Sequence, residues 1–298
     1  MAYQAVHDLD TDGIVGPATW AKITGAAPVS SSGAPLASSE QVRGARLSWI
    51  GAWCGNRSLA NPERDVAFAE SIGLDGLTIM VHDVSKARAP RGFQLRSTTK
   101  ILALADAIRA AGMDVGLCAW AMPHRKYLEK AARELISLAT DAGARTVEWD
   151  AEEPWTQATG HMGHPEAAAL IGDLFAGRAF ELGANAIGYT PAPKFGPLAA
   201  VCDYVVPQAY STNTSGQHPS EAAHVFHERF AQFGYVSRIG LAAYRQDGID
   251  GYTPTTAMET AIRCARATGV HDVCYWGLDA LRMGDPAVAA VVARAKEL

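Results

Sequence analysis

The sequence predicts an α/β chain whose main domain is a (β/α)8 barrel (TIM barrel). From Arg46 onward, apolar runs of strand length alternate with amphipathic runs of helix length, and eight strands fit into roughly 250 residues. A doubly wound open sheet is the alternative, but it usually has fewer strands and a glycine-rich phosphate loop after the first strand, which this sequence lacks. The predicted strands span residues 47–54, 76–82, 114–122, 146–152, 186–190, 204–210, 238–244 and 272–278.

The helical runs between these strands have recognisable ends. Ser97 and Thr253 are N-cap residue types at the starts of two of them. The main helical runs cover residues 98–111, 125–142, 165–182, 221–233 and 255–268. Glycine stands at helix ends, where a left-handed residue is favoured, at Gly73, Gly112, Gly143, Gly183, Gly234 and Gly269.

A change in composition separates the barrel from the N-terminus. Residues 26–44 are mostly small and polar and include proline, which is typical of a linker. We therefore divide the chain into a short segment of residues 1–25, a linker of residues 26–44 and a barrel of residues 45–298.

One predicted strand carries three carboxyl groups at alternate positions, Glu148, Asp150 and Glu152. Side chains two residues apart share one face of a strand, and like charges this close raise at least one pKa, which keeps an acid protonated near neutral pH. A solvent-facing edge strand could carry the same residues, but a strand in the middle of the alternation is expected inside the sheet. This acid row indicates acid–base chemistry on a polar substrate, most readily a glycosidic bond.

Aromatic residues flank the acid row. Trp149 and Val147 are expected on the opposite face of the strand, and Pro154 and Trp155 follow it. Aromatic faces beside carboxylates suit the stacking of sugar rings, so we expect Trp149 and Trp155 to favour a carbohydrate substrate.

Polar and aromatic residues collect at the C-terminal ends of the other predicted strands, where this fold builds its active sites. As a set at one rim, they favour a carbohydrate cleft. The residues expected to bind substrate are Trp53, Asp83, Trp120, Glu153, Tyr189, Gln208, Tyr244, Trp276 and Asp279.

Composition excludes several classes of partner. The net charge is −5 and no Lys/Arg run is present, so no nucleic-acid footprint is expected, and no apolar run reaches the roughly 18 to 20 residues that span a bilayer. The five cysteines are an odd number without a C-x-x-C pair, and they are expected to be buried thiols of a chain folded in a reducing compartment. The N-terminus lacks a basic region followed by an apolar stretch, so no signal peptide is expected. We expect a soluble monomer.

The acid row resembles the catalytic motifs of known glycosidases. The sequence from Glu148 to Glu152, E-W-D-A-E, is similar to the end of the D-x-x-D-x-D-x-E strand of family 18 glycoside hydrolases (chitinases and related N-acetylglucosaminidases), and to the D-x-E strand of family 25 lysozymes. Gln208-Ala-Tyr210 is similar to the M-x-Y of family 18, and Trp276-Gly-Leu-Asp279 to its closing W-x-x-D. The chain has Glu148 where Asp is usual and Gln208 in place of Met, and it lacks the leading Asp.

This resemblance implies a retaining, substrate-assisted mechanism. Glu152 would protonate the glycosidic oxygen, while the 2-acetamido group of the sugar attacks the anomeric carbon. Asp150 would orient that group, Tyr210 would donate a hydrogen bond to its carbonyl oxygen, and Trp276 would form the floor of the subsite. A two-carboxylate mechanism stays open, with the nucleophile or base drawn from Asp150, Asp83 and Asp279. The catalytic candidates are Glu148, Asp150, Glu152 and Tyr210.

Residues 1–25 resemble the C-terminal half of a small three-helix peptidoglycan-binding domain, whose hallmark is D-G-x-x-G-P-x-T followed by a helix. Asp12-Gly13, Gly16-Pro17 and Thr19 match that pattern. The same stretch, Asp8-x-Asp10-x-Asp12-Gly13, imitates the opening of a calcium loop, but Thr19 stands where a bidentate Glu is required. We expect no metal and no cofactor.

Together the two resemblances imply a peptidoglycan-degrading glycosidase of the lysozyme or phage endolysin type. Its partner would be the glycan strands of bacterial peptidoglycan, cut between N-acetylmuramic acid and N-acetylglucosamine. Such a protein is made in the cytoplasm and acts on the cell wall after release. Two alternatives stay open: a chitinase-like N-acetylglucosaminidase on another polysaccharide, and a catalytically silent wall-binding barrel.

Overall fold

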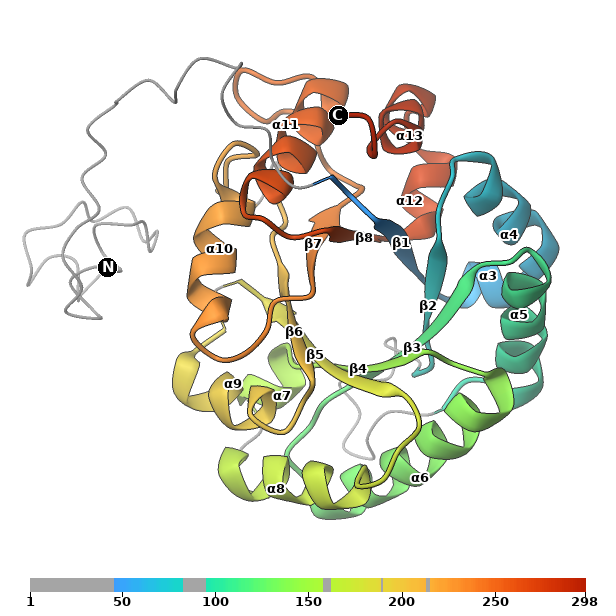
Figure 1. Cartoon of the computed structure of the whole chain (residues 1–298), viewed down its shortest axis with the longest axis vertical. Coiled ribbons are helices and arrows are strands. Elements are labelled where there is room, and N and C mark those ends of the chain that lie inside the picture. Colours follow the sequence, from blue (N-terminus) through green and yellow to red (C-terminus); the bar gives the residue numbers. More distant parts are fainter. Residues whose placement is uncertain (1–45, 83–94, 158–161, 189, 213–214) are drawn as a thin grey trace, which may run out of the picture. The chain divides into compact units, whose positions relative to one another are not determined.

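The computed structural model describes residues 46–82, 95–157, 162–188, 190–212 and 215–298. Within these ranges, parallel strands close into one barrel in the order β1 to β8, and the helices lie around it (Figure 1). The predicted (β/α)8 barrel is therefore confirmed. The N-terminal segment and the linker lie outside the described residues and stay predictions.

The strands are β1 (Trp49–Cys54), β2 (Gly76–Met80), β3 (Asp114–Trp120), β4 (Thr146–Asp150), β5 (Glu181–Ile187), β6 (Tyr204–Gln208), β7 (Arg238–Ala242) and β8 (Asp272–Trp276). The helices are α3 (Asn56–Ala60), α4 (Pro62–Ser71), α5 (Thr98–Ala110), α6 (Arg125–Ala142), α7 (Glu153–Gln157), α8 (His164–Leu174), α9 (Ala192–Ala199), α10 (Ala222–Ala231), α11 (Pro254–Ala267), α12 (Leu278–Met283) and α13 (Pro286–Ala293).

Most predicted helix ends are confirmed. Gly73, Gly112, Gly143 and Gly269 have φ angles of 68°, 73°, 59° and 89°, in the left-handed region that glycine adopts without steric cost. Helix α11 begins with a reciprocal cap between Thr253 and Thr256, each backbone N–H donating to the other side-chain oxygen. Ser97, by contrast, precedes α5 without a side-chain capping bond.

The fifth strand is the main correction to the predicted elements. Helix α8 ends at Leu174, so the predicted helix over 165–182 is too long, and β5 spans Glu181–Ile187 rather than 186–190. Gly183 is not a helix end. It lies in β5 opposite Tyr204, and a Cβ built on it would fall 2.4 Å from the Tyr204 ring. Gly234 is likewise outside the left-handed region. Strand β5 has small and polar residues where side chains of other strands need space inside the barrel. These residues interrupt the apolar run by which a strand is predicted.

A compact cluster of buried residues fills the barrel interior, separate from the larger core between sheet and helices. Its members are Trp53, Met80, Cys118, Tyr204, Val206 and Cys274. At the N-terminal end, the Trp49 ring occupies space above Gly51 and Gly76, where an added Cβ would lie 2.0 Å and 2.7 Å from its carbon atoms. This end of the barrel is therefore closed by a side chain, and the opposite end is left for a site.

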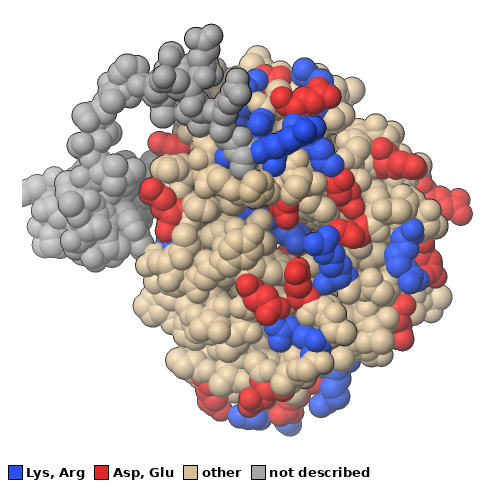
Figure 2. Space-filling model, viewed as in Figure 1, with Lys and Arg blue, Asp and Glu red and all other residues tan. Residues whose placement is uncertain are grey.

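The surface and the thiols agree with the composition. On the barrel face shown in Figure 2, Lys and Arg side chains lie among Asp and Glu side chains, and no large area carries one sign of charge. All five cysteines are free, and four of them are buried. No helix in the described ranges has both the length and the apolar character that crossing a membrane would require.

Candidate active site

Strand β4 directs two of the three predicted acids into the barrel. Glu148 and Asp150 are buried at 0% and 3% exposure, and Trp149 between them points outward and packs edge-on against Phe175 at 5.9 Å. The strand ends at Asp150, so Glu152 is not part of it as predicted but lies in the turn before α7. Two acids therefore share a strand face, and the third is placed at the C-terminal rim.

The sugar-stacking role expected for Trp149 and Trp155 is wrong. Both side chains are fully buried in the core between the sheet and the helices. Trp155 Nε1 donates to the Lys194 carbonyl oxygen at 2.8 Å, which fixes α7 against α9. Trp149 faces outward from β4 into the helix layer, and Trp155 on α7 is buried in the same layer, so neither indole lines the cavity at the rim.

A cavity of about 510 Å³ opens at the C-terminal ends of the strands. The structure brings seven predicted site residues together in its wall: Trp120, Asp150, Glu152, Gln208, Tyr210, Tyr244 and Trp276. Sequence reasoning missed the other lining residues, which are Ile187, Thr212, Ser215, Gln217 and Phe226. Most of these residues lie in the loop after β6 or on a helix. The strand pattern does not extend to these segments, so it does not predict that their side chains face the cavity.

The two acids in the cavity wall are both poised to hold a proton. Burial raises the pKa of Asp150 well above its usual range, and the nearby Glu152 and Glu148 carboxyl groups raise it further, while the hydrogen bond from Gln208 opposes them. Burial also raises the pKa of Glu152, with a further contribution from Glu153 and an opposing one from Gln208. The Asp150 and Glu152 pair therefore retains protons at a pH where isolated carboxyl groups are ionised.

Tyr210 and Tyr244 form an aromatic wall beside these acids, with ring centroids 6.3 Å apart and the rings edge to face. Burial, followed by the charges of Glu152 and Asp150, raises the pKa of Tyr210 well above its usual value. Tyr210 is therefore a neutral hydroxyl that can donate a hydrogen bond to a ligand.

Glu148 lies beneath the cavity and does not line it. Its carboxylate accepts hydrogen bonds from Trp53 Nε1 at 3.1 Å, Asn185 Nδ2 at 3.0 Å and the Tyr204 hydroxyl at 3.2 Å. Arg238 Nη1 is 3.6 Å from the same carboxylate, within ion-pair range. Asn185, Tyr204 and Arg238 were not expected in the site. Their one sequence signal is a polar residue at an inward position of a strand.

Three other predicted binding residues have different surroundings. Trp53 is 2% exposed and lies below the cavity, where its ring contacts Trp276 at 5.8 Å, so it supports the floor and does not face a ligand. Asp279 on α12 is not in the cavity wall and lies 3.8 Å from Arg282. Glu153 is exposed at the start of α7 and contributes to the pKa of Glu152. Asp83 and Tyr189 lie outside the described residues.

Across the described ranges, no group of three or more His, Cys, Asp and Glu side chains is arranged to hold a metal ion. The described residues of the cavity wall supply two carboxyl groups, two tyrosine hydroxyls and the Gln208 amide.

Comparison with known proteins gives matches in structure but not in sequence. No protein-family model and no curated protein matches the sequence. The chain is similar to a GH18 chitinase from Pseudoalteromonas aurantia (12% identity, 83% of this chain and 100% of that chain, TM-score 0.60). It is also similar to a GH18 chitinase mutant from Cycas revoluta in complex with (GlcNAc)4 (9% identity, 83% and 99%, TM-score 0.57). The likeness is one of fold. A tryptophan synthase from M. tuberculosis matches as well (13% identity, 85% and 92%, TM-score 0.52), as expected of a barrel that hosts many chemistries.

Proposed function

We propose that the chain is a glycoside hydrolase that cleaves the bond between N-acetylmuramic acid and N-acetylglucosamine in peptidoglycan. The observation that carries this proposal is the pair of carboxyl groups of buried Asp150 and half-buried Glu152, both with raised pKa values, in the wall of an open cavity with Tyr210 beside them. A general acid must be protonated at the working pH and must reach the leaving oxygen, and a carboxyl group with a raised pKa at a cavity rim meets both needs.

Glu152 is the general acid in this proposal. It is the more exposed of the two acids and lies after the strand end, so its side chain faces incoming substrate. Its proton passes to the glycosidic oxygen as the bond to the anomeric carbon breaks. The resulting carboxylate then takes a proton from the water that completes hydrolysis.

The nucleophile is the 2-acetamido oxygen of the substrate. Asp150 and Glu152 are the two carboxyl groups among the described cavity-lining residues, and Asp279 is not in that wall. Asp150 lies deeper, where a carboxyl oxygen can accept a hydrogen bond from the acetamido N–H and orient the group, while the Tyr210 hydroxyl donates to the carbonyl oxygen. Trp276 provides an apolar surface for the sugar ring.

A polymer of N-acetylglucosamine is the second candidate substrate. The structural neighbours described as GH18 chitinases favour it, and one of them is in complex with (GlcNAc)4. The peptidoglycan proposal is supported by the similarity of residues 1–25 to half of a peptidoglycan-binding domain. Both substrates carry the 2-acetamido group that the mechanism requires, so the chemistry is shared and the polymer differs.

The test is mass spectrometry of the soluble products released from purified peptidoglycan and from chitin oligosaccharides. Three proteins are compared: the wild type, Glu152→Gln, and Glu166→Gln, which neutralises an exposed α8 carboxylate outside the cavity wall. Muropeptides with new reducing ends from the wild type and Glu166→Gln, and none from Glu152→Gln, are expected. A reducing-end N-acetylmuramic acid identifies the bond.

Two other results would redirect the proposal. Cleavage of chitin oligosaccharides without cleavage of peptidoglycan would move the substrate to the second candidate. No cleavage of either polymer, with wall binding equal in the wild type and Glu152→Gln, would replace the enzyme with a binding protein.

A further inference from the structure

Hydrogen bonds and one ion pair connect the closed N-terminal end of the barrel with Asp150 at the open end. The line runs from Arg238 on β7 to Glu148 on β4, then to Asn185 on β5, Gln208 on β6 and back to Asp150 on β4. All of these residues are at most 6% exposed.

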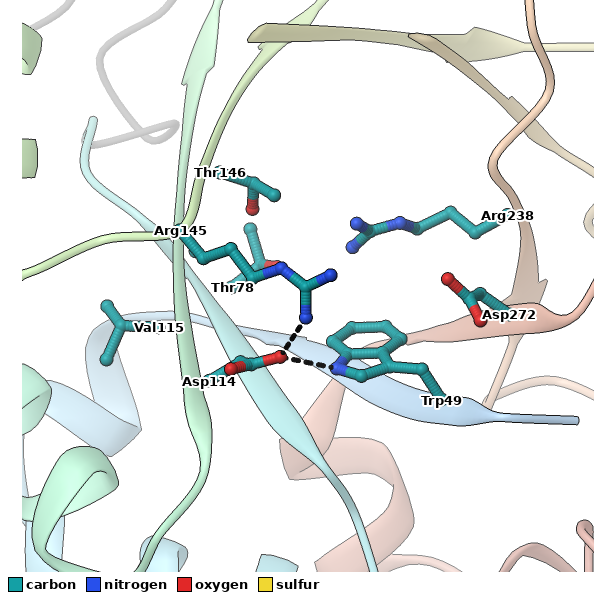
Figure 3. A pocket seen from close by; sticks show the side chains of 9 residues that line it. Trp49, Thr78, Asp114, Val115, Arg145, Thr146, Arg238 and Asp272 are labelled. Atoms are coloured by element: carbon teal, nitrogen blue, oxygen red, sulfur yellow. Dashed lines mark hydrogen bonds and ion pairs between the residues drawn. The ribbon is translucent and has the colours of Figure 1, made fainter. Parts of the chain in front are cut away.

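The line begins in a small pocket at the N-terminal end, where Arg238 and Arg145 extend toward the centre from different walls (Figure 3). Asp114 accepts a hydrogen bond from Arg145 at 2.8 Å, so that charge is already paired. The Arg238 guanidinium lies 4.5 Å from the centroid of the Trp49 ring and 5.2 Å from that of Tyr204. Held between two aromatic faces, Arg238 provides the positive charge for Glu148.

Glu148 determines the orientation of Asn185. Each hydrogen-bond and ion-pair partner of the Glu148 carboxyl group presents a donor to it, so Glu148 acts as the acceptor in these contacts. An amide is oriented by its partners, so Asn185 must turn Nδ2 toward Glu148 and Oδ1 away from it.

Asn185 in turn determines the orientation of Gln208. Asn185 Oδ1 accepts from Gln208 Nε2 at 2.8 Å, and the same nitrogen donates to Asp150 Oδ1 at 3.1 Å. The reversed amide would place Gln208 Oε1 against the Asn185 Oδ1 acceptor. In the observed orientation Oε1 has no hydrogen-bond partner among the described residues, and Gln208 lines the cavity, where a substrate hydroxyl or N–H can donate to it.

We propose that Asn185 is a positioning residue, which transmits the orientation set by the Arg238 and Glu148 ion pair to Gln208 and thereby fixes Asp150 Oδ1 as an acceptor. Oδ2 is then the oxygen of Asp150 on which a proton can reside. This inference rests on the proposed function, since it assigns a purpose to the orientation of Asp150 in that reaction.

The first variant is Asn185→Leu, with Thr78→Val as the control for an apolar replacement of a buried polar residue on β2. The Asp150 carboxyl is titrated by carbon NMR, with Asp150→Asn to assign the signal. The groups that face Asp150 are Glu148, Glu152, Cys118 and Tyr210, and none of them is altered.

With Asn185→Leu, the Gln208 amide is no longer held and its donation to Asp150 weakens, so the pKa of Asp150 is expected to rise above that of the wild type and of Thr78→Val. If the chain cleaves glycan, kcat falls by roughly 10- to 100-fold with little change in KM, the loss that misplaced catalytic groups produce. An unchanged Asp150 titration in folded Asn185→Leu would overturn the proposal.

The second variant is Asn185→Asp, which keeps the size of the side chain. When protonated, this carboxyl group has one donor and one acceptor, the same pattern as the amide, but once ionised it cannot donate to Glu148. The kcat of this variant is expected to approach the wild-type value at low pH and to depart from it as pH rises. Its Asp150 titration curve is expected to follow the wild-type curve at low pH and to depart from it at higher pH. A wild-type kcat profile and Asp150 titration in Asn185→Asp would contradict the proposal even if Asn185→Leu failed to fold.

The titration separates this inference from the proposed function because it needs no substrate. A wild type that cleaves nothing, with an Asp150 titration that moves in Asn185→Leu, would remove the proposed function and leave the positioning role standing. If the wild type cleaves glycan but the Asp150 titration does not move in Asn185→Leu, the proposed function stands and the positioning role is removed.

Discussion

Gln208 Nε2 donates a hydrogen bond to Asp150 Oδ1 across the barrel mouth at 3.1 Å, between residues 58 positions apart in the sequence. This bond is the main influence that favours the ionised form of Asp150, against burial and two nearby carboxyl groups that favour the protonated form. The balance between these effects decides how readily Asp150 exchanges a proton and how firmly its carboxyl group is oriented.

We predict that Gln208→Met removes this balance. Methionine has a similar length but no donor, so the pKa of Asp150 rises and its carboxyl group loses an anchor. We expect kcat/KM to fall by roughly 10- to 100-fold, as for a lost positioning contact. The measurement is the initial rate of glycan cleavage as a function of pH. Gln232→Met, on the exposed surface after α10, is the control, and equal rates for the two variants would contradict the prediction.

Asp150→Asn is predicted to stabilise the fold at neutral pH while removing activity. Because the folded pKa of Asp150 is raised, the unfolded state releases its proton at lower pH, and folded-state stability is lost as pH rises above the unfolded pKa of about 4. Asparagine does not ionise, so its advantage grows as pH rises from about 4 and is small below it. Urea unfolding at several pH values measures this difference. A stability gain that is independent of pH would argue against a raised pKa.

Arg238→Met is predicted to lower the free energy of unfolding by roughly 3 to 5 kcal/mol, since it leaves the Glu148 carboxylate buried without its ion-pair partner. The double variant Arg238→Met/Glu148→Gln removes both charges and should recover a large part of that loss. Chemical denaturation of the wild type, both single variants and the double variant gives the interaction energy as a double-mutant cycle. Additive effects would show that the two charges do not interact.

Gly183→Ala is predicted to destabilise the barrel by roughly 1 to 3 kcal/mol because the new methyl group would overlap the Tyr204 ring, 2.4 Å away. Gly196→Ala in α9 is the matched substitution. Its Cβ would lie 3.5 Å from Phe233, an ordinary contact, and alanine is favoured over glycine in a helix by about 1 kcal/mol. Thermal unfolding should therefore shift in opposite directions for the two variants, and a loss for both would point to a general intolerance of added volume.

Local pattern was sufficient for most of the barrel. Seven of the eight predicted ranges contain an observed strand, since apolar runs bounded by glycine and polar residues report burial on both faces of a parallel sheet. The exception is β5, where Gly183 and Asn185 interrupt the apolar run. Both residues are there for partners on other strands, and a local pattern contains no information about such partners.

The candidate site, too, was predictable from local pattern only in part. Alternation along β4 placed Glu148 and Asp150 on one face, and the rule that barrel sites form at C-terminal strand ends brought Trp120, Gln208, Tyr210, Tyr244 and Trp276 into one cavity wall. Neither the alternation nor this rule predicts how deeply each acid is buried. Glu148 and Asp150 are neighbours on the same face of β4, yet Glu148 is enclosed beside Arg238 and Asp150 lines the cavity.

The sequence by itself determined the periodicities: a (β/α)8 barrel, an acid row on its fourth strand and a polar C-terminal rim. Only the tertiary structure decided that Trp149 and Trp155 are core residues, that Trp53 supports the floor, and that Asn185 and Arg238 belong to the site. The physical reason is that side-chain direction along a strand follows from local geometry, whereas burial, ion pairing and amide orientation depend on which residues of distant strands come to face each other when the barrel closes.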